Sequence, residues 1–582
     1  MEDLPQELVY SISSFLELED LKQTLLVSRS SQYAAEEHSS AFTDFSFWEG
    51  KTNARVLSGD ALDTLDTSKE SIWQDCAKFL NTYSGHRLRY LRHVRVHTYL
   101  PTLHRSLDDA GELVNTELKY PPCRENTSDL REKDECFTRQ IHAVLYALNE
   151  VETNAKGHYQ GKIQLTIFTP VRWVDSHHCM HRWFSSWRVH LLSPKDLPDL
   201  ASVRGLSVCV PGSGGSRNVR SSNYLLTRAR PDARVLIDLA SRCRNLEFLG
   251  CELGHEEWRR TEEDVRLQHF SRDFESCQRD SRTDFVRALN THVLPRTLRY
   301  ARLDFMKGLR QHVGEQRGGG PNLVGAAPFD GFSAGLRFLT SHLRRLDLRL
   351  IADKSLFWPT KGNKIATWPN LEELYVVFHI ITPSGSWYFQ GPLGEGQHDT
   401  GYSITSAMYP PLVDETAEDQ VWHQLSTPHF DGGVFARYRV IPNETTLVPF
   451  LTAFAEAART MHALKKATLW APLIFDPYDM PKEYDNFDPE SVSKYLYGTQ
   501  LVFGLLYSGP GFDATLSERE LYWSTGYWRP DPVLRDLFHE IGGARLGQVS
   551  EVWHDGLAER TDFEDYALLP VGIADDGYPM CF

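Results

Sequence analysis

Long hydrophobic runs are missing from this sequence. Apolar residues make up 41% of its 582 residues and charged residues 24%, which is the balance of a folded, water-soluble chain. No uninterrupted apolar stretch approaches the roughly 20 residues that a helix needs to cross a bilayer. The first residues are acidic and lead directly into a helical pattern, whereas a secretory or mitochondrial leader is basic there. We therefore expect no membrane partner and a cytoplasmic or nuclear location.

Closely spaced cysteines are also missing. The nine cysteines stand at positions 76, 123, 136, 179, 209, 243, 251, 277 and 581, and no two of them form a Cys-x-x-Cys pair. An odd number of scattered cysteines does not build a disulfide framework or a structural zinc site. This pattern favours a reducing compartment and predicts no bound metal.

Clustered positive charge is scarce as well. The net charge is −16, and His342–Arg345 is only a short basic stretch. Because binding to phosphate backbones requires grouped Lys and Arg side chains, the sequence predicts no nucleic-acid partner.

Two partial catalytic motifs each lack a required residue. His177 and His181 would share one helical face, but His178 stands where a zinc protease motif needs glutamate. Gly50 opens a Gly-Lys-Thr triplet, yet Phe45 occupies the position of the first glycine of a phosphate-binding loop. The sequence therefore predicts no catalytic residue and no cofactor, and hence a chain that is not an enzyme.

The first forty residues carry the pattern of three short helices. Pro5 is suited to a first helical turn, and Leu8, Ile12, Phe15 and Leu16 then form one apolar stripe. A second helical stretch follows Glu19-Asp20, and Ser28 is placed to cap a third helix. Three such helices bury too small a core to be stable alone, so apolar side chains left on their surface would form a binding face.

This segment resembles an F-box of the type found in filamentous fungi. The similarity rests on the order and spacing of Leu4-Pro5-x-Glu7-Leu8, Ile12-x-x-Phe15-Leu16, Leu18-x-Asp20-Leu21 and Leu25-x-Val27-Ser28-Arg29, with a short strand expected at 42–47. One position departs from the family pattern: Ser31 replaces an aromatic residue, for which Tyr33 is the nearest substitute. The resemblance implies a surface that binds a Skp-type adaptor, with these matching positions: Leu4, Pro5, Leu8, Ile12, Leu16, Leu21, Leu25 and Val27.

A helix followed by a Leu-x-x-Leu-x-Leu-like strand recurs through the rest of the chain. The strand motifs start at Leu91, Val203, Leu246, Leu298, Leu343, Leu371 and Leu464, with a weaker member at Ile163. This alternation predicts an α/β fold class: a small three-helix F-box (1–47) followed by an irregular solenoid that resembles leucine-rich repeats (48–582). From Val203 onward the motifs start 28 to 93 residues apart, against roughly 20–29 in regular repeats, so the array is degenerate. A set of ordinary α/β domains is the alternative.

Three long insertions interrupt the pattern, near 211–232, 305–328 and 383–442. The last is rich in Gly, Pro and aromatic residues. Because aromatic side chains dominate interface hot spots, we take Trp387, Tyr388, Phe389 and Tyr402 as candidate substrate-contact residues. The alternative is that Trp387 and Phe389 pack the insertion onto the array. Beyond it, a helix is expected from Pro530 to Phe538, and Val549–Trp553 is expected to close the array.

The resemblance implies a non-catalytic adaptor subunit of a Skp–cullin–F-box ubiquitin ligase. Such a subunit binds a Skp-type adaptor, and through it cullin and RING subunits, and recruits a protein substrate for ubiquitination. Two other interpretations remain open at this point. The first is an F-box interaction protein that acts outside a ligase. The second is a repeat scaffold whose first helices cap the array.

Overall fold

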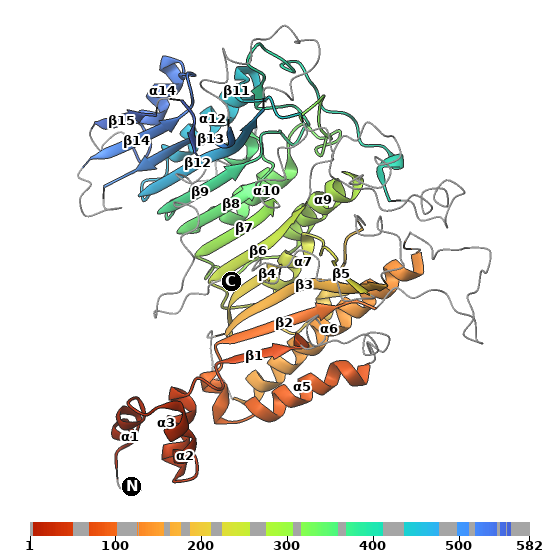
Figure 1. The fold of residues 1–582 in the computed structure, drawn as a ribbon, viewed down its shortest axis with the longest axis vertical. Helices are drawn as coiled ribbons and strands as arrows, with labels where there is room; N and C mark the ends of the chain where they lie inside the picture. Colours follow the sequence, from red (N-terminus) through yellow and green to blue (C-terminus); the bar gives the residue numbers. More distant parts are fainter. Residues whose placement is uncertain are drawn as a thin grey trace, which may run out of the picture.

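The computed structural model describes residues 4–49, 69–101, 125, 127–155, 163–175, 187–210, 224–255, 275–306, 316–358, 368–410, 436–476, 498–510, 518–543, 548–554 and 556–559. The fold is mixed α/β and is built on one sheet of 14 strands (Figure 1). Twelve of these form a continuous path in the order β1-β2-β3-β4-β6-β7-β8-β9-β12-β13-β14-β15. Neighbours are parallel from β1 to β12, β13 is antiparallel to both β12 and β14, and β15 is parallel to β14.

The strands of the main path follow one another in chain order. They are β1 (Asp44–Phe47), β2 (His93–Tyr99), β3 (Ile163–Asp175), β4 (Val203–Cys209), β6 (Phe248–His255), β7 (Tyr300–Met306), β8 (Arg345–Leu350), β9 (Glu373–Phe378), β12 (Lys466–Phe475), β13 (Gly498–Ser508), β14 (Arg519–Ser524) and β15 (Val549–Trp553). Off the path, β5 (Tyr224–Arg228) pairs with β3 and β16 (Ala558–Glu559) with β13, while β10 (Phe389–Gln390) pairs with β11 (Ile441–Pro442).

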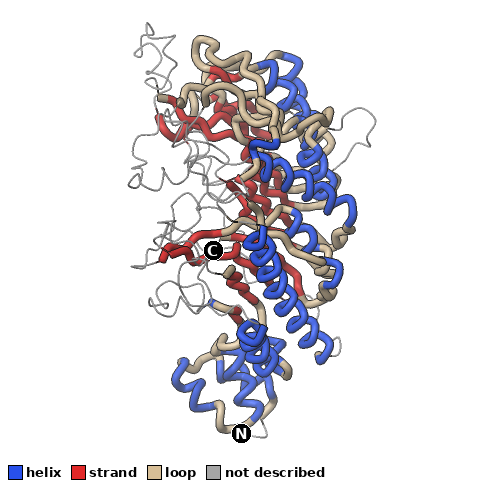
Figure 2. Tube along the Cα trace, turned by 90° about the vertical axis from the view of Figure 1, so that its right-hand side faces the viewer, coloured by secondary structure: helices blue, strands red, loops and turns tan. Residues whose placement is uncertain are grey.

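The helices that connect these strands lie on one face of the sheet (Figure 2). They are α5 (Lys69–Tyr83), α6 (Thr127–Asn154), α7 (Arg234–Ala240), α9 (Glu275–Thr291), α10 (Gly331–Thr340), α12 (Glu444–Ala458) and α14 (Pro532–His539). Crossovers between parallel strands are right-handed in nearly all proteins. When the strand order always advances in the same direction, one handedness places every crossover helix on the same side.

The recurring strand motif is confirmed at every position where the sequence predicts it. The eight segments form β2, β3, β4, β6, β7, β8, β9 and β12. Within β8, for example, Leu346, Leu348 and Leu350 point into the core beneath the helices. The expected last helix and last strand are present as α14 and β15, and β15 ends the path of the sheet.

Other elements were not expected from the sequence. Among the described helices the 28-residue α6 is the longest, and β13 and β14 form an antiparallel pair. The predicted insertion at 211–232 contains β5, which pairs with the end of β3. In the insertion at 383–442, the described residues hold β10, β11 and a short 3-10 helix, η6 (Ser406–Met408). These two insertions therefore contain ordered structure.

One hydrophobic core runs along the helix side of the sheet. Its buried side chains extend from Phe47 near the start of the sheet to Ile541 beyond α14. In the part of the chain that the structure describes, no helix has the length and apolarity of a membrane span.

Candidate functional site

The first three helices form a separate small layer beside β1 (Figure 1). They are α1 (Gln6–Ser13), α2 (Leu18–Thr24) and α3 (Arg29–His38). Ser28 caps α3 as the sequence predicts, because its Oγ accepts a hydrogen bond from the Ser31 N–H at 3.1 Å. The buried interior of this layer is small and consists of Val9, Ser13, Leu21, Ser31, Ala34, Ala35 and Glu36.

Exposed apolar side chains are concentrated on these helices. Of the eighteen large apolar side chains that are exposed in the described residues, eight lie between Leu4 and Val27. Phe15 is 84% exposed and Leu26 is 93% exposed. We call these eight side chains the amino-terminal apolar surface: Leu4, Leu8, Ile12, Phe15, Leu18, Leu25, Leu26 and Val27. Surface residues of this kind mark an interaction site when they are grouped and are unremarkable when scattered singly.

The structure exposes six of the eight positions that the resemblance assigns to adaptor binding. Leu4, Pro5, Leu8, Ile12, Leu25 and Val27 are exposed. Leu16 is half-buried, and Leu21 is buried and supports the surface from beneath. Phe15, Leu18 and Leu26 extend the surface beyond the expected set. The sequence shows that these three residues are apolar, but it does not show that they are exposed. Helical periodicity alone does not say which face of a small helix is buried.

Ser31 and Tyr33 do not belong to the amino-terminal apolar surface. The Ser31 side chain is buried, and its Oγ lies 2.9 Å from Ser28 Oγ inside the capped first turn of α3. The half-buried Tyr33 ring packs against His86 with 4.3 Å between ring centroids, and it also lies beneath the Arg89 guanidinium. Tyr33 therefore faces the connection to the sheet and lies outside the amino-terminal apolar surface.

Glu36 joins the three helices to the body of the protein. Its Oε1 accepts hydrogen bonds from Arg87 at 2.7 and 3.0 Å, and its Oε2 lies 2.6 Å from His86 Nε2. Burial alone would raise the pKa of Glu36, but the hydrogen bonds from Arg87, Gln32 and His86 outweigh it and lower the pKa below its ordinary value. Since His86 and Arg87 belong to η2 (His86–Tyr90), which leads into β2, the carboxylate holds α3 against the sheet.

The second predicted contact surface requires correction. Trp387, Tyr388 and Phe389 are buried to within 1% of full burial, so these side chains do not offer a surface to a substrate. Trp387 Nε1 donates to the Gly318 carbonyl at 2.6 Å, and the Tyr388 hydroxyl donates to the Ala352 carbonyl at 2.7 Å. The alternative interpretation applies: these aromatics pack the insertion onto the sheet. Tyr402 is half-buried, and its hydroxyl donates to Glu275 at 2.8 Å.

Charged side chains cross the sheet on the face opposite the helices. Arg345 on β8 contacts both Asp347, at 3.2 Å, and Glu373 on β9, also at 3.2 Å. Arg349 reaches Asp304 on β7 at 3.4 Å. Burial is the main reason why the pKa of Asp304 rises to about 6, although Arg349 and the Met306 N–H oppose that rise. These charges are paired with one another and leave no single-sign site.

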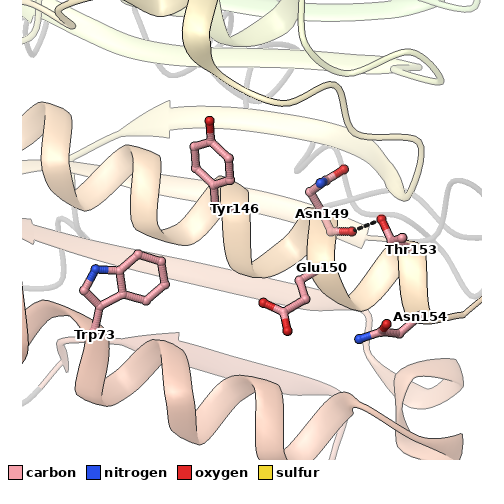
Figure 3. A pocket seen from close by; sticks show the side chains of 6 residues that line it. All are labelled: Trp73, Tyr146, Asn149, Glu150, Thr153 and Asn154. Carbon is pink, nitrogen blue, oxygen red and sulfur yellow. Dashed lines mark hydrogen bonds between the residues drawn. The ribbon is translucent and has the colours of Figure 1, made fainter.

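A hollow of about 550 Å³ lies between α5 and α6. Figure 3 shows Trp73 on α5 and the five lining residues of α6, of which Glu150 points toward α5 and Tyr146 points away from it. Glu150 is the sole carboxylate among the six side chains that line it. A single exposed carboxylate gives this hollow no pair of groups for acid–base chemistry.

The described residues contain no group of three or more His, Cys, Asp or Glu side chains that is placed to hold a metal ion. The thiols of Cys76 and Cys243 are buried, and burial raises the pKa of each to about 12. Neither thiol is therefore a nucleophile at neutral pH. The segments at His177–His181 and Gly50–Thr52, considered above for metal and phosphate binding, lie outside the described residues apart from their flanks.

Comparisons with family models and with curated proteins find no match. No family model matches the chain, and no curated protein is significantly similar to it.

Proposed function

We propose that this protein is a substrate-recognition adaptor of a Skp–cullin–F-box ubiquitin ligase. The observation that carries the proposal is the amino-terminal apolar surface on a three-helix layer whose sequence resembles an F-box. In this proposal the surface binds a Skp-type adaptor, which connects the chain to cullin and RING subunits. The rest of the chain holds a protein substrate.

The energetics support a docking role for this surface. Covering a half-exposed Leu or Ile side chain stabilises a complex by about 1 kcal/mol, from the apolar area removed from water. Burying eight such side chains within one short segment would offset a substantial part of the free-energy cost of association. In the free protein the same side chains remain partly in contact with water, whereas Val9, Leu21, Ala34 and Ala35 form the small buried interior.

We further propose that the sheet and its helices form a degenerate array similar to leucine-rich repeats. Support comes from the parallel strands in chain order, the helices on one face, and the repeated inward-pointing residues of each strand. Such an array would act by proximity, because holding a substrate near a charged ubiquitin-conjugating enzyme raises the effective concentration of its lysines. This mechanism requires no catalytic residue in the chain.

Co-purification of the full-length protein with a recombinant Skp-type adaptor tests the proposal. The double variant Leu8→Asp/Ile12→Asp is expected to lose adaptor capture, because it places two charges on the apolar surface. The matched control Leu393→Asp/Val533→Asp changes two exposed apolar residues elsewhere and is expected to retain capture. Circular dichroism spectra should be the same for all three proteins, since all four side chains are exposed.

Two outcomes would count against the adaptor role. If wild-type protein captures no adaptor, or captures it as well as Leu8→Asp/Ile12→Asp does, the apolar surface is not the docking site. If adaptor is captured but cullin and RING subunits never join it in a reconstitution, the chain acts outside a ligase.

A further inference from the structure

Charged residues at the amino-terminal ends of six neighbouring strands form a row across the sheet, which we call the ladder. After the first, each donates its backbone N–H to the carbonyl oxygen of the preceding member at 2.7 to 2.9 Å, so successive members lie at the starts of adjacent strands. In order along the sheet, the ladder consists of Arg204, Glu247, Arg299, Arg344, Glu372 and Lys465. Neighbouring strands are about 4.8 Å apart, which brings successive side chains within reach of one another.

The sign of the charge alternates along this ladder except at one step. At one end Arg204 pairs with Glu247 at 3.2 Å, and at the other Lys465 pairs with Glu372 at 2.8 Å. Between them Arg299 and Arg344 stand side by side. Like charges on directly neighbouring strands are destabilising, so this step is unfavourable in the isolated protein.

A third arginine strengthens the positive charge at this step. Arg296 precedes β7 and is exposed, and its carbonyl accepts a hydrogen bond from Arg299 Nη1 at 2.9 Å. Within the described part of the chain, no carboxylate forms an ion pair with Arg296, Arg299 or Arg344. Burial, together with the charge of Arg299, lowers the pKa of the adjacent His342, which places that imidazole in the same positive field.

Two exposed apolar residues precede the arginines in the same connections. Val293, in the short connection from α9 to β7, is 89% exposed. Phe338, in the last turn of α10 before β8, is half exposed. Both side chains belong to the connections that deliver Arg299 and Arg344 to the edge of the sheet. The surface therefore combines unpaired positive charge with apolar contacts.

We propose that this surface, formed by Val293, Arg296, Arg299, Phe338 and Arg344, binds an acidic segment of a partner protein. An anionic group between Arg299 and Arg344 removes their repulsion and accepts charge-assisted hydrogen bonds from both guanidinium groups. Apolar residues of the same segment cover Val293 and Phe338. A protein segment fits better than a nucleic acid, because the patch is small and the whole chain carries a net charge of −16. The inference does not rest on the adaptor proposal.

Fluorescence anisotropy with the full-length protein tests this inference. The probe is a labelled synthetic peptide of repeating Glu-Glu-Leu units, compared with a Gln-Gln-Leu peptide of the same length. A third peptide carrying phosphoserine in place of some glutamates shows whether carboxylates or phosphates bind more tightly. We expect the acidic peptides to bind, the Gln-Gln-Leu peptide to bind at least about tenfold more weakly, and affinity to fall as salt is added.

A matched pair of variants locates the site. Arg299→Gln/Arg344→Gln is expected to weaken acidic-peptide binding roughly tenfold or more, while removing a repulsion and so leaving the melting temperature unchanged or raised. Arg204→Gln/Lys465→Gln removes the same charge from the same ladder, but at paired positions, and is expected to bind the peptide as wild type does.

Three results would overturn the inference. They are the absence of acidic-peptide binding to wild type, equal losses in the two double variants, and displacement of the peptide by an equal concentration of inorganic phosphate. Capture of the Skp-type adaptor by Arg299→Gln/Arg344→Gln should remain at the wild-type level. The two proposals can therefore fail separately.

Discussion

At the scale of single residues, Glu36 shows how one carboxylate connects two parts of the chain. Its side chain is almost fully buried, and Arg87, His86 and Gln32 all contact it. Hydrogen bonds to a charged group contribute more than neutral ones, whereas surface ion pairs contribute little. Because Arg87 and His86 are each about one-third exposed, their contribution is intermediate.

We predict that Glu36→Gln lowers the free energy of unfolding by about 1–2 kcal/mol at neutral pH. The effect should depend on pH with a definite sign. Because the folded protein lowers the pKa of Glu36, its stabilising contribution is present above the ordinary pKa of a glutamate and is lost as the pH falls through the lowered value. The difference between wild type and variant should therefore be largest near neutrality and should shrink in acid.

Urea titrations across the acid range measure this difference. The exposed neighbour Glu37 supplies the control, and Glu37→Gln should change stability by no more than about 0.5 kcal/mol. If the difference in free energy of unfolding between wild type and Glu36→Gln grew in acid, the Glu36 carboxylate would not be the group that stabilises the contact between α3 and η2.

At the scale of elements, the packing of α1 against α3 explains why the amino-terminal apolar surface is exposed. α1 contacts α3, where Ala34 and Ala35 are buried, and α1 buries Val9 and Ser13. Small side chains on both helices permit a close approach. The larger residues of α1, including Leu8 and Ile12, consequently remain outside. Periodicity in the sequence predicts the stripe of large residues but not its direction.

The insertion around β10 belongs to the core, and a substitution there should show it. We predict that Trp387→Ala lowers the free energy of unfolding by about 3–5 kcal/mol, because a buried indole is lost and a cavity is left. The hydrogen bond to Gly318 and the contact with the Arg439 guanidinium are lost with it.

Trp73→Ala on α5 is the matched control, since Trp73 is about half exposed and should cost much less. Thermal and urea unfolding measure both variants. If Trp387→Ala instead left stability unchanged and abolished binding of a protein partner, Trp387 would be a contact residue after all.

At the scale of the whole molecule, the three amino-terminal helices and the sheet should be separable. The continuous core begins at Phe47, and β1 lies beyond the helices. We predict that a chain lacking residues 1–40 keeps its sheet, with a melting temperature within a few degrees of wild type, and loses adaptor capture. Losing Glu36 accounts for most of the expected difference in stability. Circular dichroism and hydrogen exchange of β2 to β9 measure the outcome, and a truncated chain that fails to fold would show that the helices are part of the core.

The sequence predicts the parallel strands because each carries the same spacing of apolar residues, although β4 and β9 are buried on both faces. It predicts β12 but not the antiparallel strand β13 that follows. All ten residues of β12 are buried, so the pattern of alternating burial that distinguishes a one-sided strand is absent, and nothing indicates that the next strand reverses direction. The helix α6 was predictable, since Phe137, Ile141, Val144 and Leu148 follow a helical spacing and are all buried.

The same contrast applies to the candidate site. The order and spacing of the first helices predict the amino-terminal apolar surface, whereas the prediction of a contact surface at 387–389 depends on composition alone. Composition does not distinguish an aromatic residue that is exposed to a partner from one that packs a loop. That distinction depends on the neighbours at Gly318, Ala352 and Phe503, which are distant in sequence.

The placement of the described crossover helices on one face also has a consequence for sequence divergence. Each crossover leaves the sheet and returns to the adjacent strand position, so its length does not affect the register of later strands. Insertions and deletions can therefore accumulate between strands over evolutionary time while the strands themselves change slowly. Homologues should be recognisable by a series of short strand motifs in a fixed order, aligned one by one, and not by uniform similarity along the chain.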